Sequence, residues 1–287
     1  MGVGRTLDHL DGYEGARPVR IGNAAYKQAQ HDVWGAALDS VYIHTKSRDY
    51  LPEQLWPMLS RQVEEALKKW REPDRGIWEI RGEPQHFVHS KVMCWQAVDR
   101  GAALADAYGR TERLADWRRT ADEIRASIEG NGIDARRGCF VQAYGSQALD
   151  SALLLIPGTG FVAVDDPVMV RTVDAIREDL EEEGLLLRYR TEHTDDGLGT
   201  DREGMFLACT FWLAECLAGQ GRLTDAQAVF DRVRGTANDL GLFAEEYDPV
   251  RGETLGNFPQ GLSHLSHIAA AAALARAARR SEVGTGP

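Results

Sequence analysis

Apolar residues recur at helical spacing through most of this 287-residue chain. Trp117, Ala121, Ile124 and Ile128 follow one another by four, three and four positions, which places them on one face of a helix. The same spacing recurs in three further sets, Val170/Val173/Ile176/Leu180, Phe206/Cys209/Leu213/Cys216 and Val229/Phe230/Val233/Ala237. We see no convincing pair of strands. The chain is therefore predicted to be all-α.

Long loops divide these helices into pairs. Further helices are expected at about 21–45, 54–71, 88–109, 145–156 and 259–279, so that the total is about nine. Glycine-rich loops with polar and aromatic residues are expected at about 3–20, 73–87, 131–144, 184–202 and 241–258. Two helices lie between consecutive loops. Because two antiparallel helices return the chain to the end it left, all the long loops should emerge on one rim of a ring of helical hairpins.

Composition excludes several classes of protein. The formal net charge of −11 and the lack of a Lys/Arg cluster argue against binding to nucleic acid or an anionic membrane. Cys94, Cys139, Cys209 and Cys216 show no CxxC spacing, so we expect reduced thiols in a cytoplasmic protein rather than a zinc site or a disulfide framework. The first residues lack the apolar stretch of a secretory signal.

Two of the loops carry glutamates beside aromatic residues. GIWEIRGEPQHF (76–87) contains Glu79 directly after Trp78, and LFAEEYDPVRGETLGNFPQ (242–260) contains Glu245 and Glu246. Cleavage of a glycosidic bond needs two carboxyl groups, one to protonate the leaving oxygen and one to activate water or attack. If both loops lie on one rim, Glu79 and one glutamate of the second loop share a cavity. The alternatives are a solvated glutamate at 79 and an exposed acidic turn at 245–248.

The loop at 184–202 offers a second group of polar candidates. Arg188 precedes the acidic pair Asp195 and Asp196, and an arginine can donate several hydrogen bonds to sugar hydroxyls. An ion-paired loop is the alternative. Glu203 is expected to open the next helix, where its charge would interact favourably with the helix dipole.

His86 and His89 raise the question of a metal ion. No third ligand stands at a helical spacing, and HFVH is not the HExxH pattern of zinc hydrolases. We therefore expect neither a metal nor another cofactor.

Five longer segments together resemble glycoside hydrolase family 15, which includes glucoamylases, glucodextranases and bacterial trehalases. The segments are RPVRIGNAAYKQAQHDVWGAALDS, PDRGIWEIRGEPQHFVHSKVMCWQAVDRG, FVQAYGSQALDSALLLIP, DDGLGTDREGMFLACTFWLAECLA and AEEYDPVRGETLGNFPQGLSH. The resemblance implies an (α/α)6 barrel that hydrolyses α-glucosidic bonds with inversion at the anomeric carbon. Trehalose, maltooligosaccharides and α-1,6-linked glucans are the candidate substrates.

The resemblance also implies roles for single residues. Glu79 matches the general acid, and Glu245 matches the general base, with Glu246 as the neighbour that competes for that role. Trp78 matches the aromatic residue at the subsite for the non-reducing end, and Arg188 matches an arginine that contacts bound glucose. Further candidate substrate-binding residues are Arg81, Lys91 and Glu246.

The expected helices do not complete a six-hairpin toroid. Family members of this type are much longer, and their early helices carry a Trp-x-Arg-Asp motif that this chain lacks. We therefore expect residues 1–280 to form one catalytic domain without its N-terminal helices, and 281–287 a disordered tail. The chain would be a fragment, a truncated gene product or one subunit of a split enzyme that binds sugar at most by itself.

Missing helices would also leave apolar surface uncovered on the first and last helices, and such surface favours a homo-oligomer or a partner chain that supplies the N-terminal half. The residues expected to be exposed are Ile21, Val33, Leu38, Leu262, Leu265 and Ile268.

Overall fold

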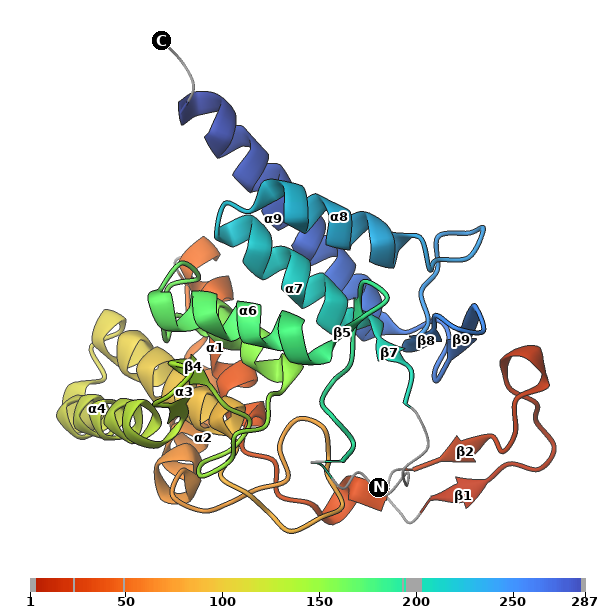
Figure 1. The fold of residues 1–287 in the computed structure, drawn as a ribbon. Helices are drawn as coiled ribbons and strands as arrows, with labels where there is room; N and C mark the ends of the chain where they lie inside the picture. Colours follow the sequence, from red (N-terminus) through yellow and green to blue (C-terminus); the bar gives the residue numbers. More distant parts are fainter. Residues whose placement is uncertain (1–3, 23, 49, 193, 195–202, 285–287) are drawn as a thin grey trace.

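The computed structural model describes residues 4–22, 24–48, 50–192, 194 and 203–284. Nine α-helices lie in this described part of the chain (Figure 1). They are α1 Val33–Arg48, α2 Trp56–Lys69, α3 Val88–Ala107, α4 Leu114–Asn131, α5 Ile156–Thr159, α6 Pro167–Leu180, α7 Leu207–Gly219, α8 Leu223–Arg234 and α9 Gly261–Gly284. Short 3-10 helices occur at Tyr13–Gly15, Ala24–Lys27, Glu53–Leu55, Thr111–Arg113 and Ser151–Leu155. The prediction of an all-α chain is confirmed.

The helices pack around α3 and α7. α3 contacts α1, α2 and α4, and α7 contacts α8 and α9. Figure 1 shows these as two groups, with α6 between them. α3 and α7 are buried along most of their length, because their sequences are apolar or small on nearly every face. They form the centre of the core around which the other helices lie.

Most of the periodic residues lie on helices as expected, but Phe206 is in a strand that precedes α7, and Ala237 lies beyond the end of α8. Trp117, Ala121, Ile124 and Ile128 are all buried on one face of α4, against α3. A helix that covers a core with one face needs this spacing of apolar residues.

Three expected helices have different bounds in the structure. Residues 21–32 contain a strand end and a 3-10 helix, and α1 begins only at Val33. The segment at 145–156 contains the 3-10 helix Ser151–Leu155 and the single turn of α5. Asp150 accepts a hydrogen bond from the Ala152 N–H and thereby fixes the start of the 3-10 helix Ser151–Leu155. α9 continues to Gly284, past the expected end at 279, and 285–287 lie outside the described residues.

The expectation that no strands pair is wrong. Antiparallel pairs join β1 (Arg5–Thr6) to β2 (Arg20–Ile21), β3 (Ile133–Asp134) to β4 (Cys139–Phe140), and β5 (Glu181–Glu182) to β6 (Leu185–Leu186). A three-stranded sheet has the order β7 (Met205–Phe206), β8 (Glu246–Asp248), β9 (Glu253–Leu255). Strands of two or three residues are too short to show an alternation of apolar and polar residues. β8 begins directly after Glu245, so this sheet fixes the position of the second glutamate loop.

Five of the six apolar residues named above are exposed as expected, four of them on α1 and α9 and Ile21 in β2. The exposed fraction is 58% for Val33, 67% for Leu265 and 62% for Ile268. Leu38 is a correction, since it is fully buried where α1 packs on α3. In the part of the chain that the structure describes, no helix has the length and apolar character needed to cross a membrane.

Candidate active site

Trp78 holds the loop of Glu79 against the core. Its indole N–H donates a hydrogen bond to Asp150 Oδ1 at 2.8 Å. Its ring centroid lies 5.4 Å from that of Phe206, in an edge-on arrangement, and it also contacts the rings of Tyr189 and Trp212. The residue that precedes Glu79 is therefore fixed by a hydrogen bond at one end and by ring packing along its faces.

Phe206 brings the second glutamate loop to the same place. Phe206 in β7 pairs with Glu246 in β8, and the N–H of the next residue, Leu207, donates to the carbonyl oxygen of Glu245 at 3.1 Å. The loops of Glu79 and Glu245, far apart in the sequence, thus both contact Phe206, one through its ring and the other through its backbone. This agrees with the prediction that both loops emerge on one rim.

Glu79 has a backbone conformation that few residues with a side chain adopt. Its φ is 55°, in the left-handed region, and its N–H donates to the Gly76 carbonyl at 3.3 Å. Ile80, the next residue, is buried in a small apolar cluster with Phe87 and Ala143. Since Trp78 and Ile80 are both anchored, the half-buried Glu79 projects between two fixed points.

Glu245 is fixed by Asn257. One carboxylate oxygen accepts hydrogen bonds from the backbone N–H of Asn257 at 2.9 Å and from its side-chain amide at 2.8 Å. Gly256 has φ 72°, and a Cβ there would lie 2.7 Å from the same oxygen. Only glycine allows this close approach. Glu246 is held differently, since its carboxylate accepts the Gly204 N–H at 3.2 Å.

Arg188 lies over the same group of aromatic rings. Its guanidinium carbon is 5.4 Å from the Trp78 ring centroid and 5.2 Å from that of Phe206. Arg188 also forms an ion pair with Glu203, whose side chain is only 5% exposed. Glu203 does not open a helix as expected, because α7 begins at Leu207.

Asp150 contacts Trp78 in this candidate site, and the sequence does not single it out. It is buried and accepts hydrogen bonds from Trp78, from the Ala152 N–H at 2.7 Å and from the Gln142 amide at 3.5 Å. Burial raises the pKa of its carboxyl to about 6, although these hydrogen bonds and the charge of Arg188 act in the opposite direction. In the sequence Asp150 stands before a short helix, which marks it only as a cap.

Asp32, just before α1, was missed as well. Burial raises the pKa of its carboxyl to about 6, and the negative charges of Asp74 and Glu79 add to this effect. Asp32 is therefore within electrostatic range of Glu79.

Comparison with known proteins identifies the family of the chain. Residues 3–272 match the sequence model of the glycosyl hydrolases family 15. The chain belongs to this family.

Two similar proteins are trehalases. The chain is 54% identical over 276 residues to a trehalase of Mycobacterium tuberculosis, covering 96% of this chain and 40% of that protein. It is 51% identical over 280 residues to a trehalase of Mycolicibacterium smegmatis, covering 98% of this chain and 42% of that protein. The chain thus spans about 40% of the length of these relatives.

Solved structures show the same fold at lower identity. A wild-type glycosidase matches with a TM-score of 0.74 and 21% identity over 93% of this chain and 74% of that one. A bacterial glucoamylase complexed with acarbose matches with a TM-score of 0.71 and 14% identity, over 86% of this chain and 41% of that one. The fold is thus the all-α barrel of family 15, to which the described residues contribute nine helices.

Two further candidates do not join the group around Trp78. Lys91 is fully buried, and its ammonium group donates to the backbone carbonyls of Trp70 at 2.5 Å and Glu72 at 2.6 Å. Its expected role in substrate binding is therefore corrected to a structural one. Arg81 is exposed beyond Ile80, and Asp195 and Asp196 lie outside the described residues.

Cavities border the site on the side of Glu203. One of about 490 Å³ is lined by Glu203, Gly204 and Met205 together with the β8–β9 turn, and one of about 400 Å³ by Glu203, Tyr189 and Arg190 among others. Among the described residues, no group of three or more His, Cys, Asp or Glu is placed to hold a metal ion.

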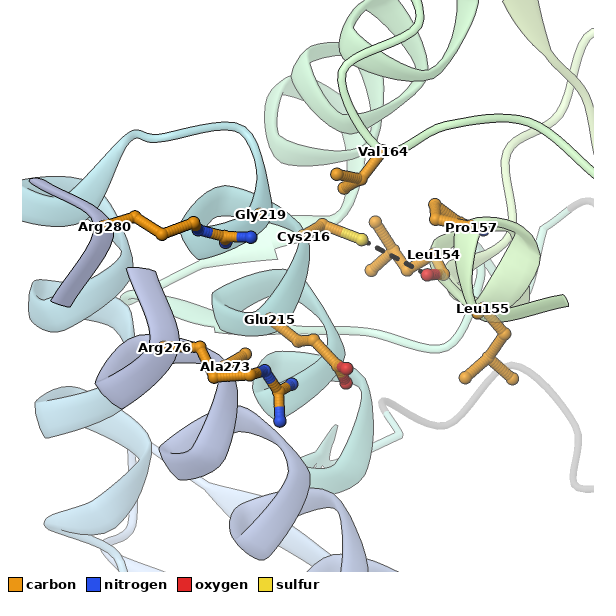
Figure 2. Close-up of a pocket in the computed structure, with 11 residues that line it drawn as sticks. Leu154, Leu155, Pro157, Val164, Glu215, Cys216, Gly219, Ala273, Arg276 and Arg280 are labelled. Carbon is orange, nitrogen blue, oxygen red and sulfur yellow. Dashed lines mark hydrogen bonds between the residues drawn. The ribbon is translucent and has the colours of Figure 1, made fainter. Parts of the chain in front are cut away.

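A separate cavity of about 290 Å³ lies where the C-terminal half of α7 faces α9 and the segment 154–158 (Figure 2). Glu215 and Arg276 extend into it, and the Cys216 thiol donates to the Leu154 carbonyl at 3.2 Å. None of the predicted site residues lines this cavity.

Proposed function

We propose that this chain carries the general acid and general base of an inverting hydrolase of α-glucosidic bonds, and that its substrate is trehalose. The observation that carries the proposal is the meeting of the Glu79 and Glu245 loops at Phe206. The substrate is taken from the relatives, since the two described above are trehalases.

Each carboxyl group has one step in the proposed reaction. Glu79 protonates the glycosidic oxygen as its bond to the anomeric carbon breaks. Glu245 removes a proton from a water molecule, whose oxygen forms the new bond to that carbon from the opposite face. This requires carboxyl groups roughly 6.5–9.5 Å apart, with the water between them. Asn257 would orient Glu245, while Trp78 and Arg188 contact the glucose unit that is attacked.

The stereochemistry of the products tests the mechanism. Both anomeric carbons of trehalose are α, so inversion at one of them releases one α-glucose and one β-glucose. Proton NMR of the anomeric signals during the first turnovers, before mutarotation, should therefore show both anomers in equal amounts. A retaining route would give α-glucose alone, and that result would refute Glu245 as a base.

A second candidate function is a chain that binds sugar but needs a partner for turnover. The specific observation is the exposure of Val33, Leu265 and Ile268 on α1 and α9, in a chain that spans about 40% of its relatives' length. Helices from a further polypeptide, or a second copy of this chain, would cover these faces.

Turnover by the isolated protein distinguishes the two functions. Trehalose, maltooligosaccharides and an α-1,6-glucan should be assayed with the 287-residue chain alone and after co-expression with the N-terminal half of a related trehalase. Sedimentation velocity would give the oligomeric state. A monodisperse monomer that turns over trehalose at ordinary rates, of order 1–10³ per second, would exclude the second candidate.

We also propose a cytoplasmic location. All four cysteines are buried and free, as is usual for proteins of a reducing compartment.

A further inference from the structure

The segment before α1 contacts the Glu79 loop through side chains at alternate positions. The side-chain amide of Gln28 donates hydrogen bonds to the carbonyl oxygens of Glu79 at 3.2 Å and of Ile80 at 3.0 Å. Gln30 donates in the same way to the carbonyl of Gly76 at 3.3 Å. One segment therefore holds the loop both before and after Glu79.

The Gln28 contacts fix the backbone on the C-terminal side of Glu79. Both neighbours of the amide are carbonyl oxygens, which only accept hydrogen bonds, so its NH₂ group must face them. The two bonds restrain the peptide group that follows Glu79 and the one after it. Glu79 has φ 55°, a conformation that costs energy for a residue with a side chain. The two hydrogen bonds therefore restrain the backbone next to this unfavourable conformation.

We propose that Gln28 is a positioning residue for Glu79: it holds this backbone in the left-handed conformation, which sets the direction of the Glu79 side chain. The inference rests on the proposed function, in which Glu79 is the general acid. A shift of about 1 Å in a catalytic group can lower the rate by roughly 100-fold. Gln28 need not touch the substrate to have this effect.

Gln28→Met tests the proposal, since methionine keeps the length of the side chain and removes the donor. We expect kcat for trehalose to fall by roughly 10- to 100-fold, with little change in KM. Gln147→Met is the matched control, because Gln147 is an exposed residue of another loop. It should leave kcat and KM unchanged. In a Glu79→Gln background, Gln28→Met should cause no further loss, because the group that it positions is then absent.

Amide hydrogen exchange gives a readout that needs no turnover. The N–H groups of Glu79 and Ile80 donate to the carbonyls of Gly76 and Arg75, and Gln28→Met should raise their exchange rates selectively. Unchanged exchange rates at both positions would overturn the proposal. A loss of kcat that is fully explained by unfolding of the variant, as shown by its lower melting temperature, would overturn it as well. If Glu79→Gln is fully active, the proposed function fails. If Glu79→Gln is inactive and Gln28→Met behaves as wild type, only the present inference fails.

Discussion

Relative to wild type, the Asp150→Asn variant should be more stable at neutral pH than it is at acidic pH. The pKa of the Asp150 carboxyl is about 6 in the folded protein and 3.8 in the unfolded chain. Ionisation is then less favourable in the folded state by about 3 kcal/mol. Because the folded pKa is the higher one, the stability from the protonated form is fully present below the unfolded pKa. It is lost as the pH rises through the folded pKa.

Asparagine imitates the neutral carboxyl without titrating. Trp78 and the Ala152 N–H both donate to Oδ1 of Asp150, so the oxygen of an asparagine can keep both bonds. Its NH₂ group would face Gln142, whose amide can rotate to present its oxygen. The stability of Asp150→Asn relative to wild type should therefore rise by about 2 kcal/mol between about pH 4.5 and about pH 7.5.

Urea denaturation of both proteins across this pH range measures the difference directly. Asp134→Asn is the control, because the backbone N–H groups of Arg137 and Arg136 lower the pKa of Asp134 below its unfolded value of 3.8. Its stability relative to wild type should fall only as the pH rises through the region below 3.8, and should stay nearly constant across the range in which Asp150→Asn changes. A difference for Asp150→Asn that is flat, or that falls with pH, would show that the carboxyl is not held in the buried state described here.

Two other predictions concern the remaining charged groups. Glu79→Gln and Glu245→Gln should each lower kcat by roughly 10²–10⁴-fold with little change in substrate binding, and Glu246→Gln should lower it much less. Equal losses of kcat for the variants at 245 and 246 in steady-state assays would contradict the assignment of the base. Arg188→Met should destabilise the protein by about 3–5 kcal/mol in urea denaturation, because it leaves Glu203 buried without its partner. Adding Glu203→Gln should restore most of the lost stability, and no recovery in the double variant would contradict this.

The sequence predicts the helices well and the site contacts only in part. The face of α4 was predictable because a helix packed on a core must repeat its apolar residues at its own period. The start of α1 was not, because residues 21–32 have no pattern that separates a strand end and a 3-10 helix from a longer helix. Glu79 and Glu245 stood out because carboxylates beside aromatic residues in loops are unusual enough to suggest a site.

Contacts between distant positions explain what was missed. Asp150 and Trp78 are 72 positions apart, and Gln28 and Glu79 are 51 apart. No local pattern joins such residues, because only the packing of α3, α7 and their loops brings them together. Lys91 shows the converse error. A lysine in a candidate segment suggests a substrate contact, but the fold encloses it where backbone carbonyls are its partners.

The backbone of Glu79 gives an independent reason to look for chemistry at this position. Among the described residues, Glu14 and Glu183 are the other non-glycine residues with positive φ. Each is followed by a glycine that also has positive φ, and Glu183 with Gly184 forms the two-residue turn between β5 and β6, where such angles are normal. Glu79 is followed by the buried Ile80 instead, in a turn that the N–H groups of Glu79 and Ile80 close by donating to the carbonyls of Gly76 and Arg75. Such a turn needs a left-handed residue at this position, which is usually glycine. A glutamate there costs backbone energy that the surrounding structure must offset, and residues of this kind cluster at functional sites.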